Sequence, residues 1–247
     1  MNIVADLTLS ALRNTGIDNL GSYSQSLISA CDKHQPPFGM AWYGDQYRGY
    51  AKDPHWLAFS LVANAEVEGD GARKLWKIAG YAEQKSQSEL VKQHAVDEAR
   101  HARLYIHMLR RVFPGAMDRE LENAAKAMSP TISMRDILPE STPAPKMRLL
   151  DDLIQMNIGE IRTRIHQQLL RPVILAHCPL AERATIAHAL EALLADETRH
   201  IAYTAELIEQ HSQSGHDEFV RLTMEKRLAQ FNEITLNEVG ALIFDGE

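Results

Sequence analysis

A five-residue motif, Asp-Glu-x-Arg-His, occurs twice in this chain, 99 positions apart: as DEARH at residues 97–101 and as DETRH at residues 196–200. Each copy places a glutamate and a histidine three residues apart, which is just under one helical turn, so both side chains project from one helix face. A carboxylate and an imidazole placed in this way can bind one metal ion. Two such helices supply two thirds of the protein ligands of a dinuclear site in a helix bundle. The pattern therefore requires two further helices, each with one inward carboxylate.

Helical periodicity dominates the rest of the sequence, and sustained apolar/polar alternation of the kind found in strands is nearly absent. Asp53-Pro54 is a strong helix start, because aspartate caps well and proline suits the first helical position. Pro172 is expected to end or kink the helix that contains it. Long helices are expected at about 53–82, 86–113, 146–172 and 181–212, with a last amphipathic helix at about 217–243.

These elements predict one all-α domain of 247 residues. Its core is expected to be a four-helix bundle over residues 53–212. Short helices and a loop at 34–52 would form an N-terminal extension at 1–52, and a further helix would occupy 213–247. A segment rich in proline, serine and threonine at 129–145 is expected to be the long crossover between the two helix pairs.

Two glutamates in the first long helix compete for the role of inward carboxylate. Glu68 shares a helix face with leucines and alanines, whereas the face of Glu66 becomes charged within a turn. A buried carboxylate is costly unless it is paired or bound to metal, so Glu68 is the expected ligand and Glu66 the reserve. In the third long helix, Glu160 shares an apolar face with Leu153 and Met156. The expected ligands are Glu68, Glu98, His101, Glu160, Glu197 and His200.

Four carboxylates and two imidazoles suit iron or manganese, and the set lacks the thiolates that favour zinc or clusters. Asp97 and Asp196 each precede a ligand glutamate, and each is expected to accept the remaining ring N–H of a ligand histidine. A single Glu-x-x-His is usually only a solvated pair. Two near-identical motifs, each with a bare glutamate 30 or 37 residues upstream, are far less expected by chance.

With Glu68 and residues 97–101, and Glu160 and residues 196–200, the sequence resembles the oxygen-activating branch of the ferritin-like di-iron carboxylate superfamily. That branch includes multicomponent monooxygenase hydroxylases, ribonucleotide reductase small subunits, acyl-carrier-protein desaturases and arylamine N-oxygenases. The resemblance covers about residues 53–212 and is more specific for the metal site than for the substrate.

The resemblance implies a ferritin-like four-helix bundle with two iron ions, or a manganese/iron pair, and O2 as co-substrate. It implies hydroxylation, N-oxygenation, desaturation or C–C cleavage of a small organic molecule. An external electron donor, such as a separate reductase or ferredoxin, would be needed, because the chain has no donor domain. Association as a homodimer is expected by analogy.

Two side chains lie one helical turn from the expected ligands in the second long helix. Tyr105 follows His101 by four residues, the offset at which ribonucleotide reductase small subunits that carry a tyrosyl radical place their tyrosine. An ordinary buried tyrosine is the favoured interpretation. His94 precedes Glu98 by four residues and is a candidate seventh ligand, although a hydrogen-bonded core histidine is favoured.

Two side chains follow Glu160 in the third long helix. Arg164 is expected to point near the site, where it would clamp a substrate carboxylate or, as the safer interpretation, neutralise a nearby acid. Thr163 is a candidate for proton delivery, although an inward threonine on a helix more often bonds its own backbone.

The composition restricts the functions further. Thirty-three acidic against 26 basic residues, with no basic run, argue against a nucleic-acid or anionic membrane partner. No apolar run is long enough to span a bilayer, and the N-terminus lacks a signal-peptide pattern. Cys31 and Cys178, far apart and without a C-x-x-C, favour the reducing cytoplasm and argue against a rubredoxin-type iron site.

Two alternative functions remain within the same superfamily. An iron-oxidising or peroxide-reducing protein like the ferritins or rubrerythrins is disfavoured by the extra terminal helices, which exceed a minimal bundle. A transfer-RNA hydroxylase is disfavoured by the acidic net charge of −7.

Overall fold

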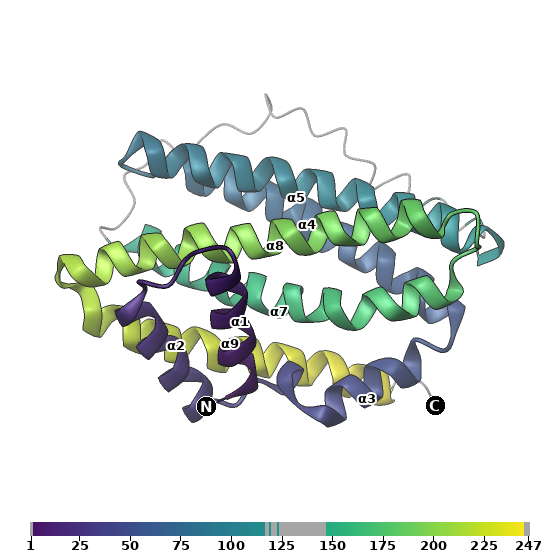
Figure 1. The fold of residues 1–247 in the computed structure, drawn as a ribbon, viewed down its shortest axis with the longest axis horizontal. Helices are drawn as coiled ribbons and strands as arrows, with labels where there is room; N and C mark the ends of the chain where they lie inside the picture. Colours follow the sequence, from purple (N-terminus) through teal and green to yellow (C-terminus); the bar gives the residue numbers. More distant parts are fainter. Residues whose placement is uncertain (1, 117–118, 120–122, 124–146, 245–247) are drawn as a thin grey trace. The chain divides into compact units, whose positions relative to one another are not determined.

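All regular secondary structure is helical in the computed structural model, which describes residues 2–116, 119, 123 and 147–244 (Figure 1). The all-α prediction is confirmed for these residues, and the ferritin-like arrangement stays a prediction. The chain divides into two compact units. Unit 1 comprises Met1–Asp45, Leu150–His166 and Glu197–Glu247, and unit 2 comprises Gln46–Leu149 and Gln167–Asp196. This division does not decide between one domain and two, so the single-domain interpretation also stays a prediction.

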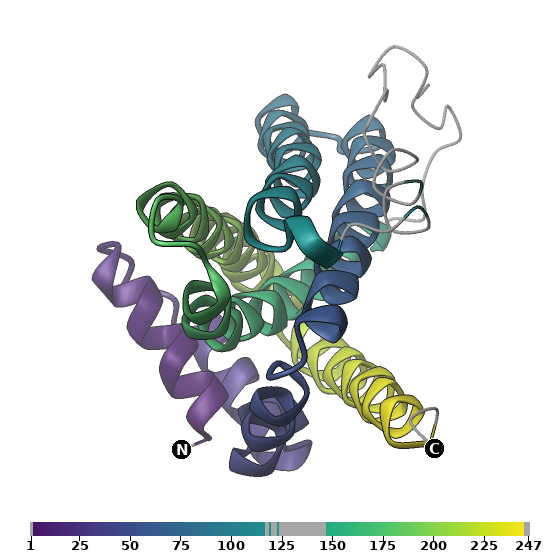
Figure 2. The same cartoon turned by 90° about the vertical axis from the view of Figure 1, so that its right-hand side faces the viewer.

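Unit 2 is built on the helix pair α4 (Pro54–Gly80) and α5 (Lys85–Val112), which lie side by side (Figure 2). The carboxylate of Asp53 accepts the backbone N–H of His55 at 2.9 Å, so α4 begins at the predicted cap. Parts of α7 (Arg148–His177) and α8 (Arg183–His211) complete this unit. The core contains apolar side chains from all four helices, including Leu57, Leu61, Ala102, Leu109, Leu170, Ile174, Leu190 and Leu193.

Unit 1 contains α1 (Ile3–Asn14), α2 (Gly21–Lys33), the short 3-10 helix η1 (Pro37–Gly39) and α9 (Asp217–Phe244). Helix α2 packs against α9, and Lys33 forms an ion pair with Glu225 at 2.7 Å. The turn η3 (Ser212–His216) joins α8 to α9. Gly215 adopts a φ of 96° in this turn, a conformation that glycine reaches without steric cost.

Two local expectations need correction. Helix α7 does not end at Pro172 but continues to His177. Pro172 and Gln168, whose carbonyl loses its helical partner to the proline, are both exposed, so water can solvate that carbonyl and the helix tolerates the proline. The stretch that follows Pro36 is not a plain loop, because it forms η1 and then α3 (Ala41–Tyr50).

The predicted crossover at 129–145 lies outside the described residues. None of the helices in the described part of the chain combines the length and the apolar character needed to cross a membrane.

Candidate metal centre

Unit 2 holds a buried cluster of two carboxylates and one imidazole. Glu68 extends from α4, and Glu98 and His101 extend from α5, with 6%, 6% and 0% of their surfaces exposed. One ligand atom of each lies within 4.8 Å of the others. The Nδ1 atom of His101 is 3.5 Å from Glu98 Oε1 and 3.8 Å from Glu68 Oε2. The spacing in the sequence therefore does place these three predicted ligands together.

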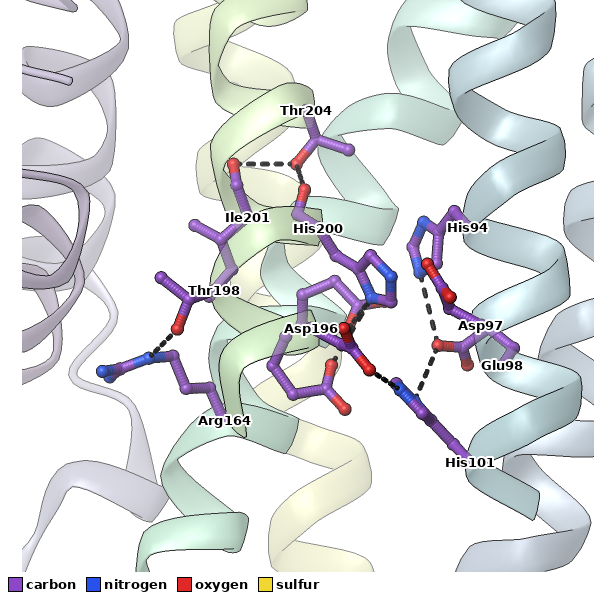
Figure 3. A network of polar contacts seen from close by, with 12 residues as sticks. His94, Asp97, Glu98, His101, Arg164, Asp196, Thr198, His200, Ile201 and Thr204 are labelled. Carbon is purple, nitrogen blue, oxygen red and sulfur yellow. Dashed lines mark hydrogen bonds and ion pairs between the residues drawn. The ribbon is translucent and has the colours of Figure 1, made fainter. Parts of the chain in front are cut away.

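The other nitrogen of the His101 ring is held by a carboxylate. Its Nε2 atom lies 3.1 Å from Asp196 Oδ2 (Figure 3). Arg100 donates to this same carboxylate and, at 3.1 Å, to Asp97. The predicted contact between Asp196 and a ligand histidine is confirmed. Asp97 accepts from Arg100 and, at 3.3 Å, from Gln93, and its own contact with a ligand histidine stays a prediction.

The electrostatics of this cluster favour a cation. Burial, and next the adjacent Glu98 carboxylate, raise the pKa of Glu68 well above its usual value. Burial opposes a charge on His101, yet hydrogen bonds with Asp196, Glu68 and Glu98 raise its pKa to about 11. The acidic side chains around the ring therefore favour a positive charge on or beside His101, and a metal ion bound at Nδ1 would supply it in place of a proton. The residues fit a metal ion of the kind that carboxylates and imidazoles bind.

Two neighbours of Glu98 and one exposed residue of α4 bear on this set of ligands. His94 is 1% exposed, and its Nε2 atom lies 3.4 Å from Glu98 Oε1, so it remains a candidate additional ligand. A Cβ atom built on Gly71 would lie 3.1 Å from Glu98 Oε2, so α4 approaches this carboxylate closely where it has no side chain. Glu66 is exposed, which confirms that Glu68 and not Glu66 occupies the buried face of α4.

Tyr105 lies one turn beyond His101 on α5 and is 2% exposed. Its hydroxyl accepts a hydrogen bond from the side-chain amide of Gln167, which is 3% exposed. Tyr105 is thus buried and hydrogen-bonded, as the favoured interpretation requires, and its redox role stays a prediction.

Unit 1 holds the second set of predicted ligands. Glu160 extends from α7, and Glu197 and His200 extend from α8. The Nδ1 atom of His200 lies 3.7 Å from Glu160 Oε2 and 3.7 Å from Glu197 Oε2. Glu197 and His200 are 0% and 1% exposed, and the side chain of Glu160 is 12% exposed. The second Glu-x-x-His motif and its bare glutamate are therefore also brought together.

Arg164, which is expected to point near the site, faces away from the His200 ring. Its Nε atom donates to the hydroxyl of Thr198 at 3.0 Å, and Figure 3 shows this pair on the side of α8 away from the His200 ring. The physical reason is helical spacing: Thr198 lies two residues before His200, so the two side chains leave α8 in different directions. Thr163 is partly buried, and its predicted role in proton delivery stays a prediction.

Two features of the site escaped the sequence interpretation. Gly71 lies inside α4, where a glycine ordinarily weakens a helix, but its missing side chain leaves room for Glu98. Asn157 is fully buried and hydrogen-bonded to Thr204 of α8. Its position, three residues before Glu160 on an apolar face, is the signal that could have identified it.

No protein-family model matches this chain, and neither a curated protein nor a solved structure matches it.

Proposed function

We propose that this protein is a non-haem di-iron oxygenase or oxidase that uses O2 to transform a small organic substrate. The observation that carries the proposal is the buried set of Glu68, Glu98 and His101, whose histidine is oriented by Asp196. An iron pair, or a manganese/iron pair, would supply O2 activation that side chains alone do not provide. The organic reaction would be hydroxylation, N-oxygenation, desaturation or C–C cleavage.

The protein's own residues have definite tasks in this proposal. His101 would present Nδ1 to the metal while its Nε2–H donates to Asp196, which fixes the tautomer and the direction of the ring. Glu68 and Glu98 would supply negative charge to offset the metal. The near-complete burial of all three side chains would exclude water from the reacting centre.

The second metal is proposed from the repeated sequence motif. Glu160, Glu197 and His200 offer the same donor types, with the same three-residue spacing between glutamate and histidine. We assign one ion to each set and propose that the two ions form one dinuclear centre, as the resemblance implies. Electrons would come from a separate reductase or ferredoxin.

The test is to load the metal-free protein with Fe(II) under anaerobic conditions, count the bound iron, and then follow O2 consumption and visible absorption after mixing. An O2-activating centre binds about two irons per chain and consumes O2 without accumulating mineral. Uptake of many irons per chain would instead favour a ferritin-like storage protein. Fewer than one bound ion per chain of iron or manganese would reject the proposal.

The matched variants are Glu68→Ala and Glu66→Ala. Both remove a carboxylate from α4, two residues apart, but only Glu68 is buried beside His101. Loss of O2 consumption in Glu68→Ala together with retention in Glu66→Ala would tie the reaction to the buried cluster. Equal activity of the two variants would argue that the O2 chemistry arises elsewhere.

A further inference from the structure

A buried network of hydrogen bonds in unit 1 connects α2, the second helix of the protein, to the two helices that carry Glu160 and His200. The Tyr23 hydroxyl donates to Asn157 Oδ1 at 2.9 Å, and Asn157 Nδ2 donates to Thr204 Oγ1 at 2.9 Å. Tyr23, Asn157 and Thr204 are each 0% exposed. Buried polar groups are costly unless their hydrogen bonds are made. The hydrogen bonds of this network therefore fix the three side chains in one arrangement.

The available donors and acceptors determine the direction of each hydrogen bond in this network. The Thr204 hydroxyl donates to the His200 carbonyl at 2.7 Å, so its oxygen is left to accept from the Asn157 amide (Figure 3 shows the Thr204–His200 bond). The second amide hydrogen of Asn157 goes to the Ile201 carbonyl at 3.2 Å. The Asn157 carbonyl therefore needs a donor, which is the Tyr23 hydroxyl. Burial raises the pKa of Tyr23 far above its usual range, which keeps that proton in place.

This hydrogen-bond network lies one helical turn from Glu160 on α7 and from His200 on α8. Asn157 precedes Glu160 by three residues on α7, and Thr204 follows His200 by four residues on α8. The Asn157–Thr204 bond therefore joins α7 to α8 one helical turn from the point where Glu160 Oε2 lies 3.7 Å from His200 Nδ1. A change in the spacing of the helices at the first contact would change the separation of the two ligands at the second.

Tyr23 itself is held at both ends. Its backbone N–H donates to Glu209 Oε2 on α8 at 2.7 Å, and its hydroxyl reaches Asn157 on α7. One residue of α2 thus makes hydrogen bonds to both helices that carry the ligands of unit 1.

We propose that Asn157 and Tyr23 are positioning residues that set the separation of Glu160 and His200 for metal binding. The N-terminal extension is then a working part of the metal centre and not only a cover over its core. This inference rests on the proposed function, because it assumes that Glu160 and His200 bind a metal ion. Outer residues that orient metal ligands typically affect metal affinity by about 10- to 100-fold.

The test uses Tyr23→Phe, which removes one oxygen, and Asn157→Leu, which removes the whole amide. The matched control is Tyr43→Phe, because the Tyr43 hydroxyl is also mostly buried in unit 1 but lies 2.6 Å from His166 Nε2 instead of bonding Asn157. Each variant is made in two backgrounds. Glu68→Ala weakens the ligand set of unit 2 and leaves that of unit 1 to report, and Glu160→Ala does the reverse.

Cobalt(II) is the probe, with affinity and coordination read from its visible absorption and global stability from chemical unfolding. In the Glu68→Ala background, Tyr23→Phe should weaken cobalt binding about 10-fold and alter the absorption band. In the Glu160→Ala background it should change neither quantity. Tyr43→Phe should leave cobalt binding unchanged in both backgrounds. Asn157→Leu should follow Tyr23→Phe with a larger effect, and Tyr23→Phe carries the test if Asn157→Leu fails to fold.

The inference is overturned if Tyr23→Phe lowers stability but leaves cobalt affinity and the absorption band unchanged in the Glu68→Ala background. It is also overturned if the loss of affinity is equal in both backgrounds, which a general destabilisation would cause. Cobalt binding by the parent protein distinguishes a failure of this inference from a failure of the proposed function. If it binds about two cobalt ions and Tyr23→Phe is silent, only this inference fails. If it binds none, both the proposed function and this inference fail.

Discussion

Two histidines in this chain, the fully buried His101 and the half-buried His166, have opposite affinities for protons. In unit 2, His101 has its pKa raised to about 11, because hydrogen bonds with Asp196, Glu68 and Glu98 outweigh the effect of burial. In unit 1, burial and then the charge of Arg162 lower the pKa of His166 to about 3. Burial, reinforced by a nearby positive charge, therefore keeps an imidazole neutral where no acidic partner opposes it.

The contrast identifies what is special about His101. The His166 ring stacks on Tyr43 with an angle of 13° between the ring planes, and its Nε2 atom lies 2.6 Å from the Tyr43 hydroxyl, an environment that suits a neutral ring. The surroundings of His101 are instead arranged for a positive charge. A proton can supply that charge in the metal-free protein, and a metal ion can supply it when bound.

The largest expected effect comes from removing a carboxylate beside His101. Glu68→Ala should weaken metal binding by more than about 100-fold, because loss of a ligand exceeds the usual effect of outer residues. Glu66→Ala on the exposed side of α4 should leave affinity unchanged. Both affinities can be measured by titration with Fe(II) under anaerobic conditions. Similar affinities in the two variants would show that the acidic cluster is only a buried ion pair.

The next effect tests the neutral histidine. Because the pKa of His166 is lower in the folded protein than its unfolded value near 6.5, protons favour the unfolded chain, and stability should fall as the pH drops below that value. The cost attributable to His166 should reach about 2 kcal/mol by pH 5. His166→Gln has no titrating ring and should lack this part of the decline.

Chemical unfolding of the metal-free protein and of His166→Gln at pH 5 to 7.5 measures the difference. Other titrating groups contribute to both curves and cancel in the comparison. If the two curves run parallel, His166 is not held neutral by its surroundings, and the proposed difference between His166 and His101 is wrong.

A smaller effect is expected at the outer partner of His101. Asp196→Asn keeps the size of the side chain but removes the charge that faces His101 Nε2 and Arg100. Metal affinity should fall about 10-fold, because the ring becomes a weaker ligand with a less fixed orientation. Gln93→Leu is a suitable control, since it removes a partner of Asp97 without touching His101. An Asp196→Asn variant with the parent's affinity would show that Asp196 is not needed to orient the ligand.

The smallest effect compares two glycines of α4. Gly69→Ala meets no atom within 4 Å and should stabilise the protein by about 1 kcal/mol through helix propensity. Gly71→Ala should gain less stability and weaken metal binding a few-fold, because its Cβ would displace the Glu98 carboxylate by a few tenths of an ångström. Thermal unfolding and metal titration of both variants test this. Indistinguishable behaviour would mean that α4 makes no close approach that matters to Glu98.

The sequence was sufficient where a local rule acts alone. Asp53-Pro54 predicted the start of α4, since capping depends only on nearby residues. The apolar stripe of α4 separated the buried Glu68 from the exposed Glu66. Helical spacing brought Glu98 and His101 together, and the neighbouring position of Asp196 indicated its contact with His101.

Other features depend on packing between elements and could not be predicted in this way. Whether Pro172 ends a helix depends on solvent at Gln168. The importance of Gly71 depends on how closely α5 brings Glu98 to α4. The hydrogen bond from Tyr23 to Asn157 joins residues 134 positions apart. The direction of the Arg164 side chain depends on Thr198, which lies on another helix.

The most direct measurement is a crystal structure of the protein loaded with Fe(II), with anomalous scattering recorded at the iron absorption edge. We expect two anomalous peaks per chain, one at bonding distance from His101 Nδ1 and the other at bonding distance from His200 Nδ1, each with glutamate oxygens completing the contact. Strong density for both histidines and glutamates with no anomalous peak beside either ring would contradict this expectation.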